Sequence, residues 1–212
     1  MNKNLFFRKP FRYTFFNATL FLILINVLVY VVSIFIPLTG YYLGLSPYGV
    51  IKMHGFWQFV TYMFVHGGFR HIFFNMLGLL FFGFTLERAM GSKEFLLFYF
   101  TCGILSGVLS FAVFMITKVN VLLIGASGAI YAVLFAYAVG FPKSMIYIWG
   151  LLPVPAPILV GAYAVIEIVS EIFGSSNTAH LTHLFGFLIA WIYFLIRMGI
   201  HPIKIWIDAY KN

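Results

Sequence analysis

Six long apolar segments dominate the chain, and short breaks with polar or turn-forming residues separate them. Their approximate bounds are 15–37, 70–88, 94–116, 127–142, 151–172 and 181–198. About 20 apolar residues in a helix span the hydrocarbon core of a bilayer, and a helix satisfies its own backbone hydrogen bonds there. The pattern therefore predicts an all-α membrane protein built as a bundle of six transmembrane helices.

The stretch 41–69 is too long for a plain connector and too mixed in polarity for a span. It is rich in glycine and aromatic residues, among them Trp57 and Tyr62. Aromatic side chains gather at membrane–water interfaces. We therefore predict a structured interfacial loop after the first helix.

Composition supports the bilayer as the solvent of this chain. Of its 212 residues, 63% are hydrophobic and only 8% are charged, whereas about 25% are charged in a soluble domain. The net charge of +8 is better explained by cytoplasmic flanks of membrane helices than by nucleic-acid binding. The single cysteine, Cys102, excludes an intramolecular disulfide.

The distribution of basic residues predicts the orientation. The first apolar segment is longer than the ~7–15-residue core of a signal peptide, so we expect an uncleaved span. With six spans, the side that holds both termini carries ten of the 13 basic residues: Lys3, Arg8, Lys9, Arg12, Arg88, Lys93, Lys143, Arg197, Lys204 and Lys211. The positive-inside rule makes this side cytoplasmic.

These bounds predict a basic cytoplasmic segment 1–14, a six-helix domain 15–198 and a cytoplasmic tail 199–212. Because no Arg- and Ser-rich leader is visible, the sequence fits most simply a prokaryotic plasma-membrane protein.

Two of the predicted spans are short. The segment from Ser127 to Pro142 would be ~24 Å long as a helix, against ~30 Å of hydrocarbon, and the segment from His183 to Arg197 is similar. If their cytoplasmic ends lie at the interface, Ser127 and His183 both begin below the outer surface. Two reactive side chains at one depth indicate a functional site.

The motif Gly125-Ala126-Ser127-Gly128 places a serine at the start of a predicted helix. Glycine lets the backbone turn sharply, and the free N–H groups of a helix N-terminus favour a developing negative charge. This is the arrangement that an oxyanion hole needs. Alone, the motif is more typical of a capping serine beside packing glycines, because such short patterns recur by chance.

Small residues recur every four positions after this serine, at Gly128, Ala132, Ala136 and Gly140, and the last span repeats the spacing at Gly186 and Ala190. Small faces allow close helix approach in lipid. Pairing the two faces would bring Ser127 near His183.

Histidine is the base that a serine nucleophile needs near neutral pH. His183 and the rival base His180 lie in the last span, where an ionisable side chain is a functional candidate. Their i, i+3 spacing would serve a metal only with further ligands. The chain has no His-Glu-x-x-His motif, so the sequence gives little support for a metal site.

Three further side chains are candidates for support of the site. His71 and Asn75 share one helix face and can donate to an oxyanion, although hydrogen bonding between helices explains them as well. Tyr131 lies one turn after Ser127 and can pack against a histidine. None of the five acidic residues has an evident place beside His183, so the sequence favours a Ser–His dyad over a triad.

Together these motifs resemble the rhomboid family of intramembrane serine proteases, over about residues 55–195. The residues that carry the resemblance are Trp57-Gln58, His66, His71-x-x-x-Asn75, Glu87, Gly125-x-Ser127-Gly128, Tyr131 and His183-x-x-Gly186. The family often has alanine before the catalytic histidine and Gly-Gly after it, where this chain has Thr182 and Leu184-Phe185-Gly186. The loop tryptophan is usually followed by arginine, which Gln58 replaces here.

The resemblance implies a rhomboid-like bundle with Ser127 as nucleophile and His183 as general base and acid. Asn75, His71 and the backbone N–H of Ser127 would form the oxyanion hole, with Gly125 as a supporting residue. Substrates would be transmembrane helices of other proteins in the lipid bilayer, cut without a metal or nucleotide, and the oligomeric state stays open. The runner-up is an inactive rhomboid-like protein that binds transmembrane clients. A transporter or channel would predict pore-lining charges that the spans lack.

Overall fold

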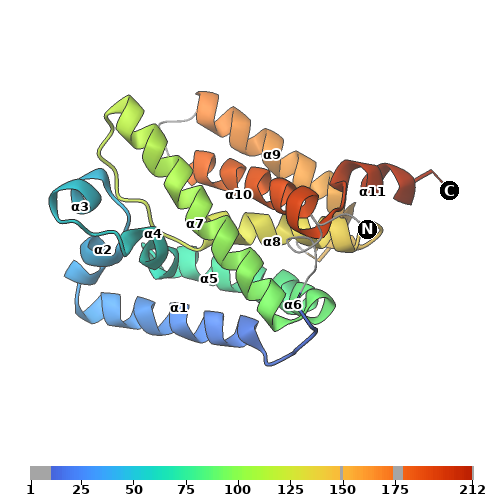
Figure 1. Ribbon diagram of the computed structural model, residues 1–212, viewed down its shortest axis with the longest axis horizontal. Helices are drawn as coiled ribbons and strands as arrows, with labels where there is room; N and C mark the ends of the chain where they lie inside the picture. Colours follow the sequence, from blue (N-terminus) through green and yellow to red (C-terminus); the bar gives the residue numbers. More distant parts are fainter. Residues whose placement is uncertain (1–10, 149, 174–178, 212) are drawn as a thin grey trace, which may run out of the picture.

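The computed structural model describes residues 11–148, 150–173 and 179–211. Within these ranges the chain is mostly helical (Figure 1). The helices are α1 (Ala18–Phe35), α2 (Leu38–Leu43), α3 (Pro47–Lys52), α4 (Gln58–Thr61), α5 (Phe69–Gly78), α6 (Phe84–Met90), α7 (Ser92–Thr117), α8 (Ser127–Gly140), α9 (Ala156–Phe173), α10 (Ala179–Tyr193) and α11 (Pro202–Ala209). The shorter helical segments are η2 (Tyr62–Phe64), η3 (Leu79–Gly83) and η4 (Phe194–Met198).

Five of the described helical stretches are long and apolar enough to cross a membrane. They are Ala18–Phe35, Phe69–Met90, Ser92–Thr117, Ala156–Phe173 and His180–Met198. Helix α8 is apolar but shorter, with 14 residues. The predicted helical membrane bundle is therefore confirmed, with five long spans and one short central helix.

Helix α8 is surrounded by other helices. It lies in the middle of the bundle in Figure 1, and it packs against α7, α9 and α10. Ala132, Val133, Ala136 and Ala138 are fully buried. A helix that is apolar all round belongs in a protein interior, and its small side chains let its neighbours come close.

The predicted interfacial loop is a chain of short helices, α2 to η2, beside one end of the bundle (Figure 1). Gln58 anchors it from a fully buried position. Its side-chain oxygen accepts from Ser46 N at 3.2 Å, and its nitrogen donates to Tyr42 O at 3.2 Å. Gly49 packs directly on this amide, since a Cβ there would lie 2.3 Å from Gln58 Oε1.

Tyr62 joins the same loop to the bundle. Its hydroxyl donates to Gly103 O in α7 at 2.6 Å. Its ring lies against Gly107, where a Cβ would approach within 2.7 Å. Its carbonyl oxygen accepts from Gly125 N at 2.9 Å. Tyr62 thereby fixes the strand-like segment before α8 relative to α7.

Two buried acids hold the opposite end of the bundle. Glu87 accepts from Ala18 N at 2.6 Å and from Thr19 N at 2.9 Å, which satisfies the first N–H groups of α1. Glu94 pairs with Arg197 of η4 at 3.0 Å. Both side chains are fully buried, and each ties helices together.

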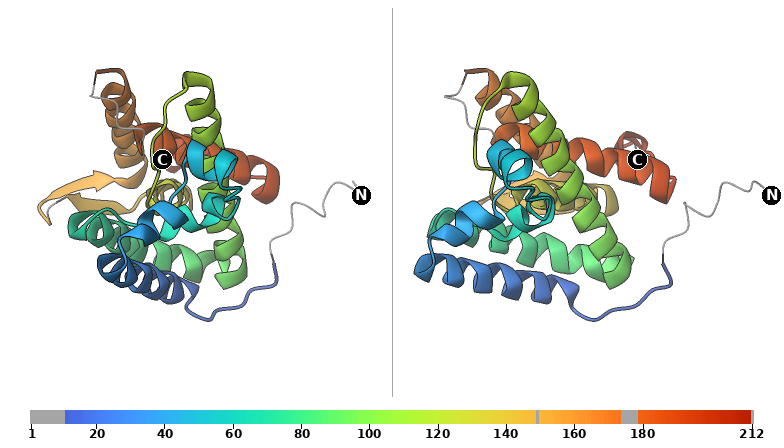
Figure 2. Two further views of the ribbon diagram at one scale, coloured as in Figure 1. Left: turned by 90° about the vertical axis from the view of Figure 1, so that its left-hand side faces the viewer. Right: turned by 60° about the vertical axis from the view of Figure 1, so that its left-hand side comes forward.

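A hairpin departs from the all-helical prediction. Strands β1 (Met145–Ile148) and β2 (Leu152–Pro155) pair antiparallel and project from the bundle in Figure 2. The last strand continues directly into α9, so this helix begins at Ala156 rather than near residue 151. The predicted tail contains α11, whose Trp206 Nε1 donates to Ala138 O at 2.9 Å.

Candidate active site

The serine motif is held in place before α8 begins. Leu123 and Leu45 exchange backbone hydrogen bonds of 2.8 and 2.9 Å, and Gly125 follows with φ +115°. Side chains rarely adopt this φ. A Cβ at Gly125 would also lie 2.7 Å from His71 Nε2. Glycine is therefore required here, and it brings His71 to the backbone that leads into Ser127.

The close approach of α8 and α10 depends on two glycines. A Cβ at Gly186 would lie 2.2 Å from Gly128 O and 3.5 Å from Ala132 N. The predicted pairing of small faces is present at these positions. Gly140 does not share in it, because this residue is exposed and has nothing within 4 Å of its Cβ position.

This contact brings Ser127 and His183 together. His183 Nε2 lies 2.8 Å from Ser127 Oγ, which is hydrogen-bonding distance. Ser127 is half-buried, and the side chain of His183 is 14% exposed. Ser127 opens α8, so the first N–H groups of this helix have no acceptor within it. The hydroxyl of Ser127, the imidazole of His183 and the free N–H groups of α8 therefore lie together at a partly exposed site.

Tyr131 holds the histidine ring from one side. The two rings stack with centroids 4.1 Å apart and an interplanar angle of 9°. The tyrosine hydroxyl donates to Glu167 Oε1. The ring thus restricts the imidazole of His183 to one plane while its hydroxyl reaches the neighbouring carboxylate.

Glu167 is the site residue that the sequence did not place. This residue of α9 is 4% exposed, and its Oε1 lies 3.0 Å from His183 Nδ1. Its other oxygen pairs with His180 Nδ1. The prediction that no acidic residue lies beside His183 is therefore wrong, because a buried carboxylate contacts this histidine. The sequence feature that could have indicated Glu167 is its position as an acidic residue within an apolar segment.

His180, the rival base, pairs through its Nδ1 with Glu167, and its ring centroid lies 6.4 Å from that of His183. Its side chain is 26% exposed. Of the two histidines, only His183 has a described hydrogen bond to Ser127. This geometry favours His183 as the partner of the serine.

The predicted oxyanion donors lie on α5. The amide of Asn75 is buried and donates to His71 O at 2.8 Å, which uses one of its two hydrogens. His66 packs edge-on against His71, with ring centroids 4.9 Å apart. Burial lowers the pKa of His66 to about 4, so this ring is neutral at physiological pH. The structure thus places His71 beside Gly125, and Asn75 one turn farther along the helix.

Three of these side chains also form a possible metal donor set. The ligand atoms of Glu167, His180 and His183 all lie within 4.8 Å of one another. Zinc uses such nitrogen and oxygen ligands. Here both histidines hydrogen-bond to Glu167, and the second ring nitrogen of His183 hydrogen-bonds to Ser127. The arrangement fits an activated serine more directly than a metal centre.

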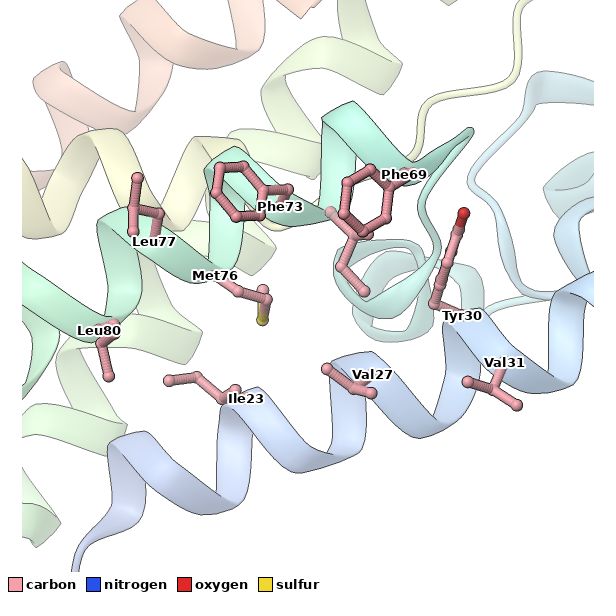
Figure 3. Close-up of a pocket in the computed structure, with 10 residues that line it drawn as sticks. Ile23, Val27, Tyr30, Val31, Phe69, Phe73, Met76, Leu77 and Leu80 are labelled. Atoms are coloured by element: carbon pink, nitrogen blue, oxygen red, sulfur yellow. The ribbon is translucent and has the colours of Figure 1, made fainter. Parts of the chain in front are cut away.

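An apolar groove of about 440 Å³ lies elsewhere, between α1 and α5. Figure 3 shows its lining, which includes Ile23 and Val27 of α1 and Phe73 and Met76 of α5. Among the side chains given for this lining, Tyr30 alone carries a hydroxyl, which lies at one end. These side chains have no group for hydrolysis, so the groove fits contact with lipid or apolar helices.

Comparison with known proteins decides the family. Residues 53–199 match the family described as Rhomboid domain. The chain belongs to the rhomboid family. The resemblance predicted from the separate motifs is thereby confirmed, and the protein is an integral membrane protein.

Curated relatives agree with this assignment. The chain is 31% identical to "Putative rhomboid protease YdcA" of Bacillus subtilis, over 70% of this chain and 67% of that protein. It is 31% identical to "Rhomboid-like protein 19" of Arabidopsis thaliana, over 81% and 58% of the two chains. It is also 32% identical to "Inactive RHOMBOID-like protein 8" of Arabidopsis thaliana, over 45% and 27%. The relatives thus include proteins named as proteases and one named as inactive.

Proposed function

We propose that this rhomboid protein is an intramembrane serine endopeptidase that cleaves transmembrane helices of other proteins. The single observation that supports this most strongly is the 2.8 Å hydrogen bond between His183 Nε2 and Ser127 Oγ. A hydroxyl is a weak nucleophile until an adjacent base takes its proton. The free N–H groups in the first turn of α8 lie beside Ser127 Oγ and can stabilise the oxyanion that forms on the substrate.

The reaction follows the logic of acyl transfer. Ser127 Oγ attacks the scissile carbonyl carbon as its proton passes to His183 Nε2. The tetrahedral oxyanion is stabilised by N–H groups at the start of α8, with Asn75 and His71 as further donors. His183 then protonates the leaving amine, which gives an acyl-enzyme. Water, deprotonated by the same imidazole, releases the carboxylate product and restores Ser127.

The proposed substrate class follows from the location of the site. The helices around Ser127 are candidate membrane spans, and α8 begins inside the bundle rather than on a soluble domain. A peptide must leave its helical hydrogen bonds to expose a carbonyl carbon to the serine, so helices weakened by glycine or proline are favoured. We place both termini in the cytoplasm, because this orientation puts the excess of basic residues there.

The alternative is a rhomboid-like protein that binds transmembrane clients without cutting them. The relative named as inactive makes this the relevant second class. The retained hydrogen bond between Ser127 and His183 argues for activity in this chain, since a binding function does not need an aligned hydroxyl and imidazole.

Cleavage by single-site variants tests the proposal. The purified protein is incubated in proteoliposomes with a single-span substrate, beside Ser127→Ala, His183→Ala and His180→Ala. We expect cleavage by the wild type, none by Ser127→Ala, and a loss of at least about 10²-fold in His183→Ala. Equal cleavage by wild type and Ser127→Ala would refute the protease. Loss in His180→Ala alone would refute His183 as the base.

A further inference from the structure

Glu167 is a buried acid in a stretch of α9 whose neighbouring residues face outward. It is 4% exposed, whereas Val165, Ile166 and Ile168 beside it are 46 to 60% exposed. An ionisable side chain inside a membrane span is costly unless it is paired, and it marks a functional site by default. Glu167 meets three donors, on Tyr131, His180 and His183. Its burial therefore serves a specific set of contacts.

These contacts determine which nitrogen of His183 holds the proton. An ionised carboxylate only accepts hydrogen bonds, so the 3.0 Å contact with Glu167 Oε1 requires a hydrogen on His183 Nδ1. In a neutral imidazole the other nitrogen is then the acceptor. Nε2 is the atom 2.8 Å from Ser127 Oγ. The carboxylate thus holds His183 in the tautomer that can take the proton of Ser127.

We infer that Glu167 is a positioning residue that extends the Ser127–His183 pair to a Glu–His–Ser relay. This inference rests on the proposed protease function. When Ser127 attacks, His183 becomes a cation, and a carboxylate 3.0 Å from its Nδ1 stabilises that cation. A dyad without an acid lacks this stabilisation.

His180 and Tyr131 orient the carboxylate in turn. His180 Nδ1 pairs with Oε2, and the Tyr131 hydroxyl pairs with Oε1. Both oxygens are thus held while Oε1 faces His183. This places His180 behind the carboxylate, with Glu167 and His183 between it and Ser127. Tyr131 has two roles, since its ring also stacks on His183.

An isosteric substitution separates charge from shape. Glu167→Gln keeps the volume of the side chain and removes its charge, and Glu171→Gln makes the same change at an exposed position one turn later on α9. We would measure the second-order rate of fluorophosphonate labelling, and kcat and KM for a single-span substrate. For Glu167→Gln we expect labelling and kcat to fall between about 10²- and 10⁴-fold, with KM within about twofold. Glu171→Gln is expected to match the wild type.

A purely structural Glu167 predicts other results. Labelling of Glu167→Gln within about threefold of wild type would overturn the inference, as would an equal loss in Glu171→Gln. Glu167→Asp keeps the charge at a shorter reach, so it should retain more activity than Glu167→Gln. The reverse order would also overturn the relay.

Nitrogen NMR tests the same point by reading the tautomer of His183 in the wild type itself. With ¹⁵N-labelled histidine, and His183→Gln to assign the signal, we expect hydrogen on His183 Nδ1 and none on Nε2 near pH 7.5. Hydrogen on Nε2 would contradict the inference whatever the activity. If the wild type is neither labelled nor active, the protease proposal fails, whereas wild-type activity with an active Glu167→Gln removes only the relay.

Discussion

Gly186→Ala is expected to inactivate the site by separating two helices. The Cβ that this change adds would lie 2.2 Å from Gly128 O. The added Cβ and the carbonyl oxygen of Gly128 are both fixed to helical backbone, so neither can turn away as a flexible side chain would. The helices α8 and α10 must move apart instead, and they carry Ser127 and His183 respectively.

The size of the movement follows from the contact. Real Cβ contacts are essentially never under 3.0 Å, and ordinary ones begin at 3.4 Å, so the helices must separate by about 0.8 to 1.2 Å. The 2.8 Å hydrogen bond between Ser127 and His183 would then lengthen to as much as roughly 3.6 to 4.0 Å, beyond hydrogen-bonding distance. A misplacement of about 1 Å can cost about 10²-fold in rate. Overpacking of this kind costs about 1–3 kcal/mol of stability.

The assay compares kcat/KM, fluorophosphonate labelling and thermal unfolding in the same detergent. Gly140→Ala is the matched control, because this glycine belongs to the same four-residue spacing but has nothing within 4 Å of its Cβ position. We expect Gly186→Ala to lose about 10²-fold in kcat/KM and in labelling rate. Gly140→Ala should keep both. Wild-type activity in Gly186→Ala, or an equal loss in both variants, would refute the packing argument.

Three further predictions concern stability, pH and metal ions. Glu87→Ala leaves buried N–H groups of Ala18 and Thr19 without their acceptor and should cost roughly 3 kcal/mol in unfolding free energy, and an unchanged melting temperature would contradict this. Because burial lowers the pKa of His66 to about 4, the unfolded state binds a proton first as pH falls below about 6.5. The unfolding free energy should then fall by up to roughly 3 kcal/mol toward pH 4, and His66→Gln should flatten the slope of melting temperature against pH; an equal slope in both proteins would refute it. Chelators should leave labelling intact, while added Zn²⁺ should slow it less in His180→Ala than in the wild type, because the variant lacks one donor of the His–His–Glu set; inactivation by a chelator would contradict the serine mechanism.

The lengths of the apolar segments predicted most of the fold, because a helix that crosses lipid must be apolar along its whole length. Helix α7 was expected at residues 94–116 and spans Ser92–Thr117. The hairpin from Met145 to Pro155 was missed, since its second strand, Leu152–Pro155, lies at the start of the span predicted at 151–172. The buried contacts of Glu87 and Glu94 were not predicted, because sequence does not show which acids meet buried N–H groups or an arginine.

For the candidate site, local motifs predicted which neighbouring residues lie together, whereas the contact with Glu167 on a distant helix was not predicted. Gly125, Ser127 and Tyr131 lie in one short segment, so their shared place follows from helical geometry. The meeting of Ser127 with His183 was predicted from small residues on two helices, which is a contact that packing rules can supply. Glu167 comes from a third helix whose side facing the site has no such pattern, so its contact with His183 needed coordinates.

The central claim is that the Ser127 hydroxyl is activated by His183. Peptide mapping after fluorophosphonate treatment tests it most directly, since only an activated hydroxyl reacts quickly. We predict one adduct per chain, on Ser127, with the rate reduced at least about 10²-fold in His183→Ala. An adduct on another residue, or equal labelling of Ser127 in His183→Ala, would contradict the account.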